Sequence, residues 1–191
     1  MGLPEAHMKA EEILKMDREE AIEVIMTEYG DSIKRLVYTY IKDYSLTEDF
    51  TQEIFLTVYL KLDTFAGRSS LKTWVYTIAI NKCKDYLRSW HFRKMNVSNS
   101  ILEFIGTSKG PENEVIAQAE RSELIREILK LPVKYREVMI LFYYKEFSLQ
   151  EISAVLNISE GTVKVRLHRG REGLKKRLDI LGRGDINGRP S

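Results

Sequence analysis

Apolar residues recur every three or four positions along most of the chain, and no segment of useful length alternates apolar and polar residues as a strand does. In the first half, one such stripe reaches Gly30 and Asp31, and a second runs from Ile33 to Ile41. We expect Gly30 and Asp31 to end a first helix, because glycine and aspartate favour turns. The pattern as a whole predicts an all-α chain.

Two further helices are predicted in the same half, and each has a recognisable start. Ser45 and Glu48 have the spacing of a capping box, which indicates a helix beginning after the turn at Asp43–Leu46. The loop that follows ends in the pair Ser69–Ser70, either of which can cap a long amphipathic helix. Trp74 and Cys83 lie on or near the apolar side of that helix, so we expect both to be buried.

The helical pattern fails between about Met95 and Asn113, where polar residues and the pair Gly110–Pro111 collect. An irregular stretch of this length is unusual inside a compact domain, so it indicates a flexible linker. Helices are expected again at Ala117–Leu131 and Val133–Phe147. The chain is therefore expected to form two small helical domains, at residues 17–94 and 114–180, joined by the linker 95–113.

The end of the second domain has the pattern of a helix-turn-helix. Ser148 and Glu151 form a second capping box, Asn157-Ile158 predicts a tight turn, and Ser159 caps a last helix that runs to about Leu178. At 100° per residue, one side of this helix collects the apolar residues, and the opposite side is polar and mostly basic. The apolar side consists of Val163, Leu167, Leu174 and Leu178, and the opposite side of Gly161, Val165, His168, Arg169, Glu172 and Lys176.

Charge is distributed unevenly along the chain, although its net value is only +2. Residues 65–94 hold seven bases against Asp85 alone, and residues 161–178 hold seven bases against Glu172 alone. Each basic segment belongs to its own helical domain. Two such segments favour nucleic acid as the partner, whereas either one alone is more often a solvated helix face.

Several other classes of protein are excluded or disfavoured. No run of about 18 apolar residues predicts a membrane span, and Met1–Lys15 lacks the apolar core of a signal peptide. A single cysteine, Cys83, fits a reducing cytoplasm. The three histidines are scattered, and no phosphate loop or metal-ligand spacing occurs. We expect no enzyme activity, no cofactor and no metal.

Four stretches, taken together, resemble one known family. They are TEDFTQEIFL at 47–56, FAGRSSLKTWV at 65–75, IAINKCKDYLR at 78–88, and the segment from Leu131 to Arg169 that ends in SEGTVKVRLHR. In order and spacing they are similar to bacterial RNA polymerase sigma factors of the sigma-70 family, in the extracytoplasmic-function (ECF) group. The resemblance implies a region 2 domain at 17–94 and a region 4 domain at 114–180.

The resemblance also implies roles for particular residues of the first domain. In the family, an acidic helix docks on the clamp helices of core RNA polymerase, and here that helix offers Glu48, Asp49, Gln52 and Glu53. In the family, the next loop and helix capture an unstacked base of the minus-10 element on the non-template strand. The matching residues here are Phe65, Arg68, Asn81, Lys84 and Arg88, although Phe65 has core packing as its alternative.

The second domain is implied to bind the minus-35 element in the major groove, as the family does with its last helix. The matching residues are Ser159, Gly161, Thr162, Lys164, Val165, Arg166, His168 and Arg169. Many members carry a small polar residue in place of Val165, which can contact a thymine methyl but cannot donate a hydrogen bond. The implied partners are core RNA polymerase, promoter DNA and an anti-sigma factor, which in this family is often membrane-anchored.

Two interpretations from other classes remain open at this point. A stand-alone helix-turn-helix regulator that binds duplex operator DNA explains residues 120–180 equally well, but leaves the basic and aromatic segment 65–94 unexplained. A helical protein that binds only other proteins would not explain either of the two basic segments. A sigma factor is expected to require core polymerase for promoter binding, whereas a regulator is expected to bind duplex DNA without it.

Overall fold

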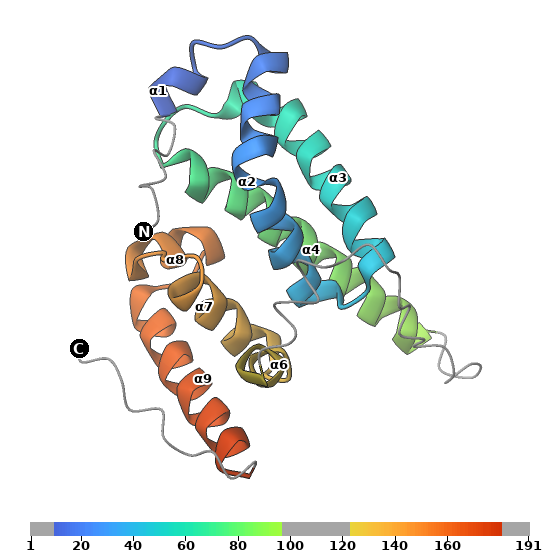
Figure 1. Cartoon of the computed structure of the whole chain (residues 1–191), viewed down its shortest axis with the longest axis vertical. Helices are drawn as coiled ribbons and strands as arrows, with labels where there is room; N and C mark the ends of the chain where they lie inside the picture. Colours follow the sequence, from blue (N-terminus) through green and yellow to red (C-terminus); the bar gives the residue numbers. More distant parts are fainter. Residues whose placement is uncertain (1–9, 97–122, 181–191) are drawn as a thin grey trace. The chain divides into compact units, whose positions relative to one another are not determined.

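The computed structural model describes residues 10–96 and 123–180, and the chain divides into two compact units. Unit 1 lies within Met1–Gly110 and unit 2 within Pro111–Ser191. The described residues of both units form helices and connecting turns, without a strand (Figure 1). The prediction of an all-α chain with two small helical domains is confirmed. Most of the predicted linker, residues 97–113, lies outside the described residues, and residues 95–96 end the last helix of unit 1.

Unit 1 contains a short helix α1 (Ala10–Ile13) and three longer ones, α2 (Arg18–Ile41), α3 (Tyr44–Lys61) and α4 (Leu71–Asn96). A 3-10 turn, η1 (Leu62–Thr64), follows α3. Helix α2 packs against both α3 and α4, and α3 also contacts α4. The core is formed by one apolar stripe from each long helix, including Ile25, Leu36, Ile54, Val58, Val75 and Ile80, all fully buried.

Two helix boundaries in unit 1 differ from the predicted ones. Helix α2 continues through Gly30, because the buried residues Tyr29 and Ile33 keep the apolar stripe in phase across it. Tertiary packing here outweighs the roughly 1 kcal/mol helix penalty of glycine relative to alanine. Helix α3 is capped by Asp43, whose carboxylate accepts a hydrogen bond from the Leu46 N–H at 2.9 Å. Ser45 therefore lies inside the helix.

The start of α4 and the state of its cysteine agree with the sequence. The Ser70 hydroxyl oxygen accepts a hydrogen bond from the Thr73 N–H at 3.1 Å, so Ser70 caps the helix. Cys83 is fully buried, and this burial raises the pKa of its thiol to about 12. A thiol in this state is a packing residue and not a nucleophile. No helix of the described residues is both long enough and apolar enough to span a membrane.

The described residues of unit 2 form α6 (Glu123–Leu129), α7 (Val133–Tyr143), α8 (Leu149–Leu156) and α9 (Glu160–Ile180). Helix α7 ends four residues earlier than predicted. Glu146 has a positive φ of 54°, and Phe147 turns back to donate its N–H to the Leu141 carbonyl, with its ring buried in the core. The capping box of Ser148 and Glu151 is present as predicted, and Asn157 ends α8 with a φ of 53°.

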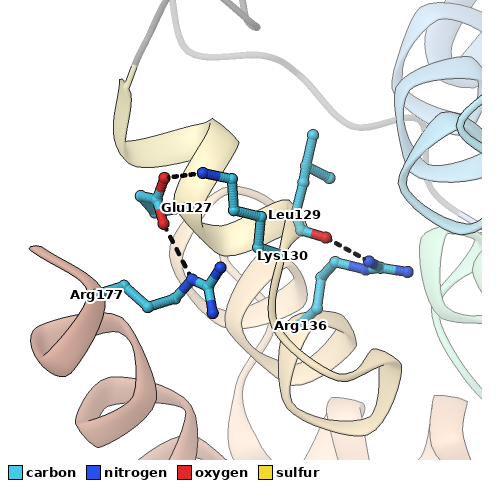
Figure 2. Close-up of polar contacts among 5 residues, drawn as sticks. All are labelled: Glu127, Leu129, Lys130, Arg136 and Arg177. Carbon is cyan, nitrogen blue, oxygen red and sulfur yellow. Dashed lines mark hydrogen bonds and ion pairs between the residues drawn. The ribbon is translucent and has the colours of Figure 1, made fainter. Parts of the chain in front are cut away.

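Helix α9 packs closely on α7. A Cβ atom at Gly170 would lie 2.9 Å from Cγ of Met139, closer than a normal contact, so the glycine permits this approach. The predicted apolar side of α9 is the buried one: Val163, Leu167, Leu174 and Leu178 are each at most 6% exposed. The C-terminal part of α9 also bonds to α6 through a buried carboxylate. Arg177 Nε donates to Glu127 Oε2 at 2.9 Å, and Lys130 donates to the other oxygen (Figure 2).

These bonds, led by the one from Lys130, lower the pKa of Glu127 against the opposing effect of burial. Arg136 is also buried, and its guanidinium donates to the Leu129 carbonyl at 2.6 Å (Figure 2). Every buried side-chain polar atom in the described residues has a hydrogen-bond partner. Unit 2 is therefore held by apolar packing together with a few fully partnered charges.

Candidate nucleic-acid interface

The outward face of α9 is polar and mostly basic, and its side chains take no part in the core. Lys164, Val165, His168 and Arg169 are all exposed, with Val165 at 51%. Val165, His168 and Arg169 lie on the side opposite the buried stripe, and Lys164 lies on its flank. Gly161 is exposed at the start of the helix, and a Cβ there would meet only the Ser159 hydroxyl at 3.9 Å. A basic face with a bare backbone at its N-terminal end can approach phosphate and base edges closely.

Ser159 and Thr162 use their side chains to form the helix cap. The Ser159 hydroxyl oxygen accepts from the Thr162 N–H at 3.2 Å and lies 2.9 Å from the Thr162 hydroxyl. Within the predicted set, these two residues therefore fix the start of α9, and the exposed residues that follow form its contact surface. The prediction that Ser159 caps this helix is confirmed.

Arg166 lies at the edge of this face and bonds inward. Its Nη1 atom lies 2.9 Å from Oε1 of Glu137 on α7, and the Glu137 side chain is only 3% exposed. The Arg166 side chain is 24% exposed. The sequence predicts that Arg166 faces DNA together with its neighbours. Helical spacing gives no sign of its contact with Glu137, because Glu137 lies 29 positions earlier in the chain.

Two further contacts restrain the exposed side chains of α9. A hydrogen bond between Tyr135 on α7 and the Arg169 guanidinium is the main cause of a lowered pKa of the Tyr135 phenol. His168 Nε2 lies 3.6 Å from the Glu172 carboxylate one turn later. Arg169 is therefore exposed on the outer side of α9 and lies near the Tyr135 phenol of α7.

In unit 1, the loop between η1 and α4 is fixed at several points. Arg18 at the start of α2 pairs with Asp63, and Gly67 takes a left-handed φ of 65°. The Leu14 side chain lies beside Gly67, 3.6 Å from where a Cβ would be. Arg68, the residue after Gly67, is exposed. Sequence reasoning missed Arg18 and Leu14, because neither belongs to a local motif around the loop.

Phe65 occupies a different place from the predicted one. Its side chain is only 3% exposed, and its ring packs on Trp74 with 5.1 Å between the ring centroids. This burial leaves no face of the Phe65 ring open to a base, so the residue supports the loop from within. Core packing, the alternative for Phe65, is the arrangement observed. Trp74 is only partly buried, so its expected burial is incomplete.

The outer side of α4 continues from this loop. Asn81 and Arg88 are exposed and Lys84 is partly exposed, and their spacing places all three on one side of the helix. Arg88 pairs with Asp85 at 2.7 Å, one turn earlier. The structure thus brings Asn81, Lys84 and Arg88 into one row, and the exposed Arg68 precedes that row on the loop.

A separate acidic face lies on α3. Asp49, Gln52 and Glu53 are exposed along one side, while Glu48 pairs with Lys34 and Glu53 lies 3.5 Å from Lys82. Two large apolar residues, Leu56 and Leu60, continue this side and are 58% and 63% exposed. The residues predicted to dock on polymerase did not include these leucines. Their spacing of three and seven residues after Glu53 nevertheless indicates the same face of the helix.

Comparison with known proteins gives matches over both units. The family model for Sigma-70 region 2 matches residues 25–91, and that for Sigma-70, region 4 matches residues 121–174. The ECF RNA polymerase sigma factor SigW of Bacillus subtilis (strain 168) is 35% identical over 176 residues, which cover 88% of this chain and 94% of SigW. SigM of the same organism, also an ECF RNA polymerase sigma factor, is 32% identical over 159 residues, 81% of this chain and 93% of SigM.

Among solved structures, the sigma factor RpoE in complex with the anti-sigma factor NepR from Bartonella quintana has a similar fold. The TM-score is 0.67 at 20% identity, and the match covers 83% of this chain and 96% of that one.

The burial of Phe65 gives the first prediction. Phe65→Ala should lower the free energy of unfolding by about 3–5 kcal/mol, because it removes a buried aromatic ring. Arg68→Ala should leave it within about 0.5 kcal/mol, because Arg68 is exposed. Urea denaturation followed by circular dichroism measures both. Equal stability of the Phe65→Ala variant and the unaltered chain would show that this ring is not part of the core.

Proposed function

Because the chain belongs to the sigma-70 family of RNA polymerase sigma factors, in its ECF group, we propose that its two units divide promoter recognition between them. The protein is a promoter-directing sigma factor. The observation that carries the proposed division is the presence of two exposed basic faces, on α9 and on α4, each belonging to its own helical unit. A stand-alone regulator is not favoured, since the family match includes unit 1 as well as the helix-turn-helix.

Unit 2 binds the duplex minus-35 element with α9 in the major groove. Arg169 and Lys164 supply the positive charge, and the exposed Arg169 guanidinium suits hydrogen bonding to a base edge or a phosphate. Val165 offers an apolar contact to a thymine methyl, and His168 lies on the same face. Ser159, Gly161 and Thr162 form the helix start, whose backbone N–H groups suit a phosphate.

Unit 1 binds the minus-10 element after strand separation. Arg68 on the loop and the row of Asn81, Lys84 and Arg88 on α4 provide a cationic and polar surface for a single strand. Phe65 contributes indirectly, because its packing against Trp74 holds the loop that presents Arg68. The Arg18–Asp63 ion pair holds the other end of that loop.

The face of α3 docks on core RNA polymerase. Asp49, Gln52 and Glu53, with Glu48 at the edge, present carboxylates and an amide that suit an arginine-rich partner surface. Leu56 and Leu60 extend this face with apolar area, which supplies affinity that exposed charges alone do not. We place this assembly in the cytoplasm, with RNA polymerase.

An anti-sigma factor is a further proposed partner. Its support is indirect: RpoE from Bartonella quintana, which shares the fold, was solved in complex with the anti-sigma factor NepR.

The docking proposal predicts the effect of a charge reversal. Asp49→Lys should weaken binding to core polymerase about tenfold or more, because it places like charges against each other. The matched control is Glu23→Lys, which reverses another exposed carboxylate, on α2. Competition of each variant with a fluorescently labelled chain for core enzyme measures the difference. Equal affinities for both variants, with unchanged melting temperatures, would refute docking through α3.

If the two units divide DNA recognition, a pre-melted promoter should partly rescue a variant of unit 1 but not a variant of unit 2. Arg169→Ala should cost on the order of 1–3 kcal/mol and relax the preference at one minus-35 position, on duplex and pre-melted templates alike. Asn81→Ala should impair open-complex formation on duplex DNA, with partial rescue when the minus-10 region is already open.

The measurement is open-complex formation by each variant holoenzyme on the two templates. An Arg169→Ala holoenzyme with unchanged minus-35 preference would contradict the assignment of α9. Normal opening of duplex DNA by Asn81→Ala would contradict the assignment of α4.

A further inference from the structure

The charge of Arg166 is neutralised inside unit 2. Its guanidinium bonds to the Glu137 carboxylate at 2.9 Å, and that carboxylate is 3% exposed. Because a buried carboxylate is costly without a partner, the pair holds Arg166 against α7 and keeps it from reaching toward DNA. Arg166 therefore differs from Lys164 and Arg169, which stand on either side of it in the sequence and are exposed.

The position of this ion pair along α9 gives it a second consequence. Arg166 lies in the same turn as Val165, His168 and Arg169, the residues of the DNA-facing side. The buried leucine and valine stripe determines broadly which side of α9 faces outward, but apolar contacts tolerate small rolls and shifts. A charged bond of defined length and direction at this turn restricts the roll and shift of the helix.

We propose that Glu137 and Arg166 are positioning residues for the recognition helix, and that they set minus-35 sequence preference without contacting DNA. This inference rests on the proposed function of α9. Helix α7 thus acts on the DNA-facing turn through the buried Glu137 carboxylate, which lies 2.9 Å from Arg166. A side chain can recognise a base edge only when it is held in the correct position. Loss of the ion pair should therefore weaken the preference for particular bases in the minus-35 element.

Unit 2 contains a matched control for this idea. The Glu127–Arg177 bond joins a carboxylate that is 6% exposed to a half-exposed arginine, also at 2.9 Å. It holds the same helix α9, but it lies three turns farther along, at the end away from Gly161 and Lys164. Loss of this second pair should weaken the fold of unit 2 without changing the orientation of the DNA-facing turn.

The experiment uses holoenzyme assembled from core polymerase and the full chain, with duplex promoters randomised at the minus-35 positions. Captured and input DNA are sequenced, which gives the preference at each position. Four variants are compared with the unaltered chain: Glu137→Met, Arg166→Met, the double Glu137→Met/Arg166→Met, and Arg177→Met. The double variant replaces the pair by apolar residues of similar length, so it should fold even if a single variant is unstable.

We expect Glu137→Met, Arg166→Met and the double variant each to reduce the preference for the best base over its competitors by about tenfold at one or more positions. Arg177→Met should retain the full preference even if its melting temperature falls. If Glu137→Met keeps the preference, the proposal is wrong, and a loss confined to variants without Arg166 would then indicate direct DNA contact. Equal loss in Arg177→Met would also refute it, since general weakening of unit 2 would explain the effect. If the unaltered holoenzyme selects no minus-35 sequence, the proposed function of α9 fails instead.

Discussion

The burial of one apolar stripe per helix is the constraint on which the rest of the structure depends. In α9 the stripe of Val163, Leu167, Leu174 and Leu178 packs on its neighbours, with Gly170 permitting close contact with α7. Because a helix has only one direction opposite its buried stripe, this packing leaves the basic face outward. The same reasoning applies to α3 and α4 in unit 1. The basic faces of α9 and α4 and the acidic face of α3 are thus the faces that core formation leaves free.

Buried charges add a second level of organisation in unit 2. Glu127 and Glu137 each accept bonds from an arginine of α9, and Arg136 bonds the carbonyl of Leu129 before α7 begins. Such pairs contribute little net stability compared with apolar packing, but an unpartnered member would be strongly destabilising. Their value here is geometric, because they fix α9 against α6 and α7.

Features with a local cause were predictable from the sequence, whereas features with a distant cause were not. The caps at Ser70, Ser148 and Ser159 depend on residues three positions away, and the α9 faces depend only on helical spacing. The sequence does not decide between Asp43 and Ser45 as the cap of α3. Both have side chains that can cap a helix, and they lie within two residues of each other.

The inward contacts of Phe65 and Arg166 were not visible in the sequence for one shared reason. Each has a motif context that indicates DNA contact and a packing partner that helical periodicity does not reveal. Trp74 lies nine residues beyond Phe65, across a loop whose conformation depends on Gly67. Glu137 reaches Arg166 only once α7 and α9 pack together. Long-range partners of this kind became visible only when the helices were placed in three dimensions.

As a promoter-directing sigma factor, this chain gives core polymerase the ability to choose promoters. The most direct measurement is transcription of fragmented genomic DNA from the source organism by core enzyme, with and without the purified chain, followed by mapping of transcript starts. We expect a new set of starts that depends on the chain and shares two upstream elements at a constant separation. Identical starts in both reactions, or chain-dependent starts without a shared upstream element, would contradict it.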